Sequence, residues 1–449
     1  MQQNMTVGKP MSLIIRFAIP MFIGSIFQQL YNMVDSIVVG RFVGASALAS
    51  VGACGPAYNL IIALVMGLTT GASVIVSQNF GSQDDENVRK SYVSSMVLVM
   101  VTGIILTGIG LLTSRVLLQI LGTPESIMDG CLSYMKIMCI GILATCLYNG
   151  MAAFLRALGN SVIPLAALIL ASLLNVVLDL LFVLGFGLGV PGVAVATILA
   201  QLISGIFCVV YMKCRVSQYW VKILDMKPNR EMLLNMTRIG IPAAVSSSIV
   251  SISTMFLQKA VNAYGTDVIA AYTAGNRTEQ ICFCLSFAIG SAVGTFVAQN
   301  VGAGQKDRVI QGLRAGCLIT LAYNIVVGVI AFVGAKYILA IFTTDSAVTE
   351  IGIGMIRVTV MFAPVLGLVF IFQNFLRNVS DVQPTVWMSL AEVVARGSLG
   401  FVFSAWFGYA GIWWATPVGW TGSAVIGFVR YKSGGWVEKS GVDKNTVKE

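Results

Sequence analysis

Four polar residues within apolar stretches of the sequence have the types and spacing of a small cation site. Asp35 ends one long apolar run, Asn175 and Asp179 lie four residues apart in a second run, and Thr197 lies in a third. A separation of four residues places Asn175 and Asp179 on the same face of a helix. Oxygen ligands suit hard cations such as Na⁺, and a carboxyl group can also carry a proton. The same groups could instead only fasten three helices together through hydrogen bonds.

The segment that carries Asp35 runs from Arg16 to Arg41 and is long enough to cross a bilayer, which takes about 20 residues. A charge in the hydrocarbon costs roughly 2.5–3.5 kcal/mol on insertion scales, so an ionisable residue there suggests a function. Asp35 and Asp179 lie near the outer ends of their segments, roughly 6–14 Å below the surface at a rise of 1.5 Å per residue. Pro20, near the inner end, predicts a hinge in this helix.

Composition decides the fold class. The chain has 449 residues, of which 57% are hydrophobic and only 10% are charged, whereas a soluble domain carries about 25% charged residues. We therefore predict an all-α polytopic membrane protein with twelve transmembrane helices. The apolar spans cover about residues 12–39, 53–79, 92–113, 130–155, 161–185, 191–213, 235–263, 268–299, 310–333, 349–376, 383–407 and 410–431.

The two halves of the chain repeat each other. Arg16–Pro20 matches Arg238–Pro242, Val76–Gly81 matches Val297–Gly302, Phe154–Arg156 matches Phe375–Arg377, and Gly192–Thr197 matches Gly411–Thr416, at offsets of 222, 221, 221 and 219. Six spans per half make the repeats parallel, with an axis along the membrane normal, as in transporters that bind substrate between two halves. We predict two pseudo-symmetric six-helix lobes: 1–213, a basic linker 214–234, 235–431, and a tail 432–449.

Basic residues predict the orientation. If the N-terminus is cytoplasmic, the inner segments hold twenty Lys and Arg residues, and the outer loops hold only Arg41, Arg115 and Lys336. This asymmetry predicts a multi-pass protein of the cytoplasmic (inner cell) membrane with both termini and the linker inside. Anionic lipid at the inner surface accounts for the net charge of +9, so we expect no nucleic-acid partner.

The residue types argue against an enzyme. The chain has no histidine, no nucleophile motif and no phosphate-binding loop, so we expect neither catalysis nor direct use of ATP. The nine cysteines lie mostly in apolar segments and form no CxxC pair, which is typical of small apolar side chains in a core. We expect no cofactor and no metal apart from possible Na⁺ as a coupling ion.

These residues resemble the multidrug and toxic compound extrusion (MATE) family, most closely its DinF-like and MepA-like bacterial branches. The resemblance rests on Pro20 and Asp35, on Asn175, Asp179 and Thr197, and on the two similar halves. It implies that Asp35, Asn175, Asp179 and Thr197 form a cation site in the N-terminal lobe. It also implies that the first helix bends and borders the substrate cavity. One departure is that the counterpart of Asp35 falls at Leu257–Gln258 and the tenth span has no Asp, which argues against a second cation site of the NorM-like type.

The resemblance implies an antiporter that exports amphipathic, often cationic small molecules in exchange for H⁺ or Na⁺, and we expect a monomer in the lipid bilayer. Candidate cavity residues are polar, aromatic or flexible and apolar: Gln28, Tyr31, Asn32, Met33, Met66, Tyr148 and Phe154. Each of them could equally be a packing residue. A flippase for lipid-linked precursors, which would need basic cavity residues such as Lys136, and a passive channel are the alternatives.

The second half carries its own charged residues within the spans. We predict a cluster of Arg277, Glu279, Arg357, Glu392 and Arg396. Glu392 and Arg396 are four residues apart, the favourable order for an ion pair on one helix. The preferred interpretation is a buried ion-pair network that stiffens the C-terminal lobe, and the alternative makes Glu279 a second group for a proton or substrate.

Overall fold

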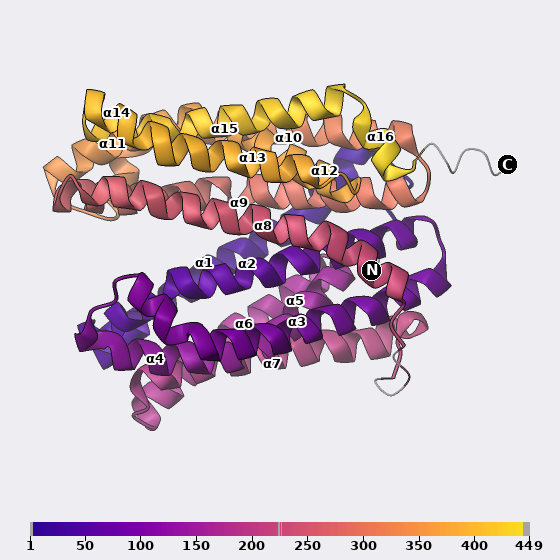
Figure 1. The fold of residues 1–449 in the computed structure, drawn as a ribbon, viewed down its shortest axis with the longest axis horizontal. Coiled ribbons are helices and arrows are strands. Elements are labelled where there is room, and N and C mark those ends of the chain that lie inside the picture. The colour runs from indigo at the N-terminus through magenta and orange to yellow at the C-terminus, as the bar shows by residue number, and fades with distance from the viewer. Residues whose placement is uncertain (1–2, 223–224, 226, 443–449) are drawn as a thin grey trace. The chain divides into compact units, whose positions relative to one another are not determined.

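The structure is a computed structural model, and it describes residues 3–222, 225 and 227–442. The described residues are helical with short connections and include no strand, which confirms the predicted all-α class. In the first half, the elements are α1 (Pro10–Val38), η1 (Val39–Val43), α2 (Ala45–Gly81), α3 (Asp85–Ile120), α4 (Glu125–Ile140), α5 (Ile142–Ala157), α6 (Val162–Leu180), η2 (Leu181–Gly185) and α7 (Gly189–Arg215). Figure 1 shows these helices in indigo to magenta.

The second half continues with the same pattern of helices. Its elements are η3 (Ser217–Tyr219), α8 (Arg230–Asn262), α9 (Thr266–Gly302), α10 (Lys306–Leu339), α11 (Ser346–Met361), α12 (Ala363–Asn378), α13 (Gln383–Val394), η5 (Ala395–Leu399), α14 (Gly400–Phe407), α15 (Tyr409–Lys432) and α16 (Gly435–Ser440). Helices α13 and α15 lie side by side. The helices α8 to α15 therefore supply the six spans predicted for this half.

The helices agree in position with the predicted transmembrane spans. Among the described residues, nine helical segments are long and apolar enough to cross a membrane, and two bent pairs add two more. The helix α15, with 24 residues, extends about 36 Å at 1.5 Å per residue, which is long enough for the twelfth predicted span. The two bent pairs break at Gly141 and Phe362, by 45° and 50°. These positions are 221 residues apart, which matches the offset of the sequence repeat.

The compact units do not follow the predicted boundary at the linker. One unit, here called the N-terminal unit, comprises Met1–Asn4 and Ile23–Ala244; the other, the C-terminal unit, comprises Met5–Phe22 and Val245–Glu449. The division therefore falls inside helix α1, between Phe22 and Ile23, and inside helix α8. The lobes at 1–213 and 235–431 stay a prediction, and the compact units differ from them at the start of α1 and the start of α8.

Close packing explains why the start of α8 belongs to the N-terminal unit. A Cβ atom placed on Gly71 of α2 would lie 2.2 Å from the carbonyl oxygen of Met236 in α8. A Cβ atom on Gly67 would lie 2.3 Å from the Cα atom of Ala244. The two helices approach backbone to backbone because both positions lack a side chain, a use of glycine that is common where membrane helices pack.

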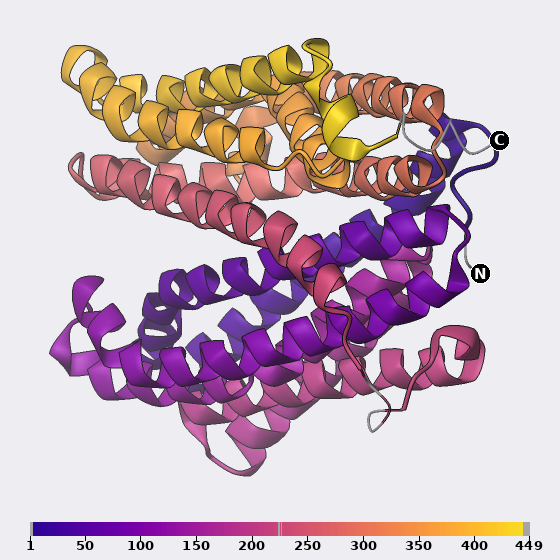
Figure 2. The ribbon, with the colours of Figure 1, turned by 45° about the vertical axis from the view of Figure 1, so that its right-hand side comes forward.

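The start of α1 is held in the C-terminal unit by hydrogen bonds and apolar packing. Phe17 and the side chain of Met5 are buried in the core of this unit. The Met5 amide donates to Gln299 Oε1 (2.9 Å), and Arg308 donates to the carbonyl oxygens of Met5 (3.1 Å) and Gly8 (3.0 Å). Figure 2 shows the indigo N-terminal segment beside the ends of the salmon helices. The first residues of the chain thus form a strap on α9 and α10.

The linker and the tail are also folded where the structure describes them. Tyr219 is buried and donates from its hydroxyl to Asp85 Oδ1 (2.7 Å) in the first turn of α3. In the tail, Trp436 of α16 is 2% exposed, and its ring centroid lies 5.2 Å from that of Phe375. The segments predicted as linker and tail therefore each add aromatic contacts to the adjoining unit.

Candidate cation-binding site

Three helices of the N-terminal unit position the four predicted site residues. Asp35 lies in the last turn of α1, Asn175 and Asp179 lie on one face near the end of α6, and Thr197 lies in α7. Both α1 and α6 continue into π-helical turns, η1 and η2, a geometry that often occurs at functional sites. Buried valines of these turns pack together with those of α7, which braces the helix ends around the polar groups.

The four residues meet at one place, as the sequence predicts. With its amide nitrogen turned toward the carboxyl groups, Asn175 donates to Asp35 Oδ1 (2.6 Å) and to Asp179 Oδ2 (3.3 Å). The same amide lies 3.5 Å from Thr197 Oγ1. Asn175 and Asp179 have no exposed surface, whereas Asp35 is half-buried. The amide therefore stands between two carboxyl groups and a hydroxyl group.

Tyr31 belongs to this cluster rather than to the cavity residues with which the sequence analysis placed it. Its side chain lies close to Asp35 and to Thr197. Tyr31 precedes Asp35 by four residues on α1, so both side chains lie on one helical face. This spacing was a usable signal, the same one that paired Asn175 with Asp179.

The site contains two carboxyl groups and no basic side chain among the residues described at it. The two carboxyl groups lie beside each other, and the other described groups next to them, Tyr31 and Asn175, are neutral. Asp179 Oδ1 is buried and has no hydrogen-bond partner among the described residues. Burying charge without a counter-charge costs several kcal/mol per ion. The site can therefore take up a small cation through its oxygen atoms or hold a proton between its carboxyl groups.

The predicted cavity residues divide into two groups. Gln28, Asn32 and Met33 are exposed on α1, and Met66 is exposed on α2, so all four are accessible within the N-terminal unit. They stay candidates for substrate contact.

Tyr148 and Phe154 were predicted at the cavity, and the structure corrects this. Both lie in a buried apolar cluster of the N-terminal unit, where the ring of Phe154 packs against Tyr92 with 4.8 Å between centroids. Phe154 borders a small cavity between α2, α3 and α5 that also has Ser73 and Ser95 in its lining. Their aromatic character reflects core packing.

Pro20 lies inside α1, which continues as a helix on both sides of it. The division between the two units follows within three residues, between Phe22 and Ile23. The helix therefore changes its packing partners just beyond the residue that lacks a backbone donor. The predicted hinge stays a prediction, and its position coincides with this division.

The charged residues of the C-terminal unit form a smaller group than predicted. Arg396 Nη2 lies 4.0 Å from Glu392 Oε2, and both side chains are buried. Glu279 lies near Arg396 and Thr359. Arg277 is exposed, so its place in a buried cluster is a correction.

Arg357 is the second correction to that cluster. Its side chain is exposed, and its guanidinium carbon lies 5.2 Å from the centre of the Phe332 ring. The prediction failed because spacing along one helix does not show which neighbouring helix each face meets.

Comparisons with known proteins agree with this architecture. The MatE family model matches residues 20–181 and 242–402, one match in each half. The probable multidrug resistance protein YpnP of Bacillus subtilis is 28% identical and covers 96% of this chain and 97% of its own length. The multidrug export protein MepA of Staphylococcus aureus is 24% identical, and the match covers 89% of this chain and 88% of MepA.

A solved structure has the same fold. The crystal structure of a MATE protein in complex with MaL6 has a TM-score of 0.90 at 23% identity and covers 98% of this chain and 99% of its own. The family match spans well over half of the sequence and follows both repeats. The chain belongs to the MatE family of membrane transporters.

Proposed function

We propose that this protein exports small amphipathic molecules, often cationic, in exchange for H⁺ or Na⁺. The observation that carries the proposal is that Asp35 and Asp179, from two different spans, lie beside each other with only neutral groups, Asn175 and Tyr31, next to them. A bound cation or proton would neutralise this pair, which gives the site a reason to bind one. The relatives named for multidrug resistance and multidrug export support the substrate class.

Coupling in this proposal passes along helix α1. The outer part of α1 carries Asp35, and its middle part carries Gln28, Asn32 and Met33, which are exposed. Neutralisation of Asp35 changes its contacts with Asn175 and Tyr31, and bending at Pro20 then reshapes the surface offered to a substrate. The bound and free states of the site thereby favour two different shapes of one helix, which is what coupling requires.

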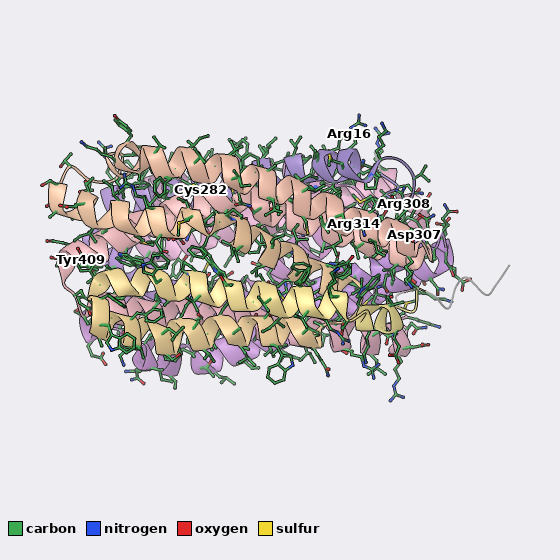
Figure 3. The ribbon with its side chains drawn as sticks, turned by 90° about the horizontal axis from the view of Figure 1, so that it is seen from above. Arg16, Cys282, Asp307, Arg308, Arg314 and Tyr409 are labelled. Carbon is green, nitrogen blue, oxygen red and sulfur yellow. The ribbon has the colours of Figure 1, made fainter. Side chains whose placement is uncertain are left out.

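The basic residues support an orientation with the chain ends inside the cell. Figure 3 shows Arg16, Arg308 and Arg314 toward one end of the C-terminal unit, and Tyr409 toward the other. An excess of Lys and Arg favours the cytoplasmic side. We propose that this end faces the cytoplasm of a bacterial or archaeal cell, in its cytoplasmic membrane, and that the transporter works as a monomer.

The flippase alternative is less well supported. Such a protein would hold phosphate groups with basic side chains that converge on a cavity. Lys136 and Arg277 are exposed in different units, Arg357 lies over an aromatic ring, and Arg396 is beside Glu392. Arg357 and Arg396 therefore already have an aromatic or acidic partner.

Transport by the purified full chain in proteoliposomes tests the proposal. A fluorescent lipophilic cation such as ethidium serves as substrate, and a pH gradient and a Na⁺ gradient are imposed in separate experiments. We expect substrate movement against its own gradient with at least one of them. Substrate movement that is equal with and without both gradients would refute cation coupling, and movement of a lipid-linked phosphate in place of ethidium would favour the flippase.

A further inference from the structure

The sequence repeat shows what became of the cation site in the other half of the chain. An offset of 221 pairs Asn175 with Arg396 and Asp179 with Gly400, and the offset of 222 that holds for the first span pairs Tyr31 with Ser253 and Asp35 with Leu257. The offset of 219 pairs Thr197 with Thr416. In this second copy both carboxylates are replaced by residues without charge, and the amide is replaced by a guanidinium.

The contacts within the C-terminal unit agree with this pairing. Arg396 Nη1 donates to Ser253 Oγ (3.5 Å), so Arg396 contacts the second copy of α1, as Asn175 contacts α1 through Asp35. A Cβ atom on Gly400 would lie 3.6 Å from Leu257 Cδ1, so the counterparts of the two aspartates also face each other. The second copy therefore brings the same two helices together but has no carboxylate at either aspartate position.

We propose that Arg396 is a built-in cation that takes, in the C-terminal unit, the place of the exchangeable cation in the N-terminal unit. This inference rests on the proposed cation coupling and adds that coupling is confined to one unit. A guanidinium carries a permanent positive charge, and it is covalently fixed. The C-terminal unit therefore keeps its charge through the transport cycle, whereas the N-terminal unit gains and loses one.

The acidic neighbours of Arg396 complete the argument. Glu392 lies one helical turn before it, with 4.0 Å between Nη2 and Oε2, and Glu279 and Tyr272 also lie near it. Arg396 is only 8% exposed, and its Nε has no hydrogen-bond partner among the described residues. These carboxyl groups have Arg396 beside them in place of an exchangeable ion.

Removal of the guanidinium should create a second site. The test uses Asp35→Asn as the parent, because this change removes the exchangeable site, and adds Arg396→Gln. Binding of radioactive ²²Na⁺ and proton uptake are measured on the purified full chain in detergent. We expect Asp35→Asn/Arg396→Gln to bind about one more equivalent of Na⁺ or H⁺ per chain than the parent. Further substitution of Glu392 by Gln should remove this gain.

The matched control is Arg357→Gln in the same parent, because Arg357 is also an arginine of a span but is exposed. We expect no gain there. No gain in a folded Asp35→Asn/Arg396→Gln protein would overturn the inference. If the unmodified chain binds no cation that depends on Asp35, the proposed coupling is refuted instead. The comparison of each variant with its Asp35→Asn parent still tests this inference.

A second variant covers the case in which the buried charge of Glu392 prevents folding. The double substitution Glu392→Gln/Arg396→Gln in the otherwise unmodified chain removes both charges of the ion pair, so neither member of the pair is left alone. We expect it to fold, to bind one Asp35-dependent cation, and to transport at the rate of the unmodified protein. A folded double variant without gradient-driven transport would show that the pair itself carries a coupling ion, which contradicts the inference.

Discussion

The substitution Arg308→Gln should release the strap that holds the start of α1 on the C-terminal unit. Arg308 donates to Met5 O (3.1 Å), Gly8 O (3.0 Å) and Asn300 Oδ1 (2.9 Å). Hydrogen bonds to a charged group contribute about 1.5–3 kcal/mol each, and partial exposure lowers this. We expect local opening of the strap to become easier by about 2–3 kcal/mol in total, and the rest of the fold to persist.

Hydrogen–deuterium exchange measures this opening directly, because the Met5 amide is protected by its hydrogen bond to Gln299. At about 1.4 kcal/mol for each factor of ten, exchange of this amide should be about 30 to 150 times faster in Arg308→Gln. The control is Arg314→Gln, an exposed arginine on the same helix (Figure 3). Equal exchange of the Met5 amide in both variants would refute the reasoning.

Three further predictions concern the site, a helix contact and the linker. The double variant Asp35→Asn/Asp179→Asn should transport no worse than either single variant, because the two carboxyl groups act as one site; an additive loss in the same efflux assay would contradict this. Replacing Gly71 by Leu should lower the free energy of unfolding by at least about 2 kcal/mol, because a Cβ there would meet backbone at 2.2 Å; Gly55→Leu, where a Cβ meets nothing within 4 Å, is the control in thermal unfolding. Burial and the adjacent Asp85 carboxylate raise the pKa of Tyr219 from 10.0 to about 12. Its protonated form therefore stabilises the fold below about pH 10, and this contribution is lost as the pH rises through about 12, so Tyr219→Phe should flatten the pH dependence of chemical unfolding in that range.

Features that depend on local sequence could be predicted. The apolar spans follow from composition and length, and the helices lie where the apolar runs do. The spacing of Asn175 and Asp179 placed them on one face, and the depth of Asp35 placed it at the same level. These predictions succeed because hydropathy and helical periodicity are properties of a short stretch of chain.

Features that depend on partners far away in the sequence could not be predicted. The burial of Tyr148 and Phe154 depends on which helices cover their faces, and the exposure of Arg277 and Arg357 has the same cause. The division of α1 after Phe22 arises from packing against residues almost three hundred positions away, such as Gln299. Periodicity identifies a face of a helix but does not identify its neighbour.

The central claim is that the carboxyl pair in the N-terminal unit carries the coupling cation. The most direct measurement is gradient-driven efflux of ethidium from proteoliposomes with Asp35→Asn, per folded molecule, beside the control Asp129→Asn, which changes an exposed carboxylate in the same unit. We predict that Asp35→Asn falls to the rate measured without a gradient and still binds ethidium, whereas Asp129→Asn transports normally. Gradient-driven efflux by Asp35→Asn at the unmodified rate would contradict the account.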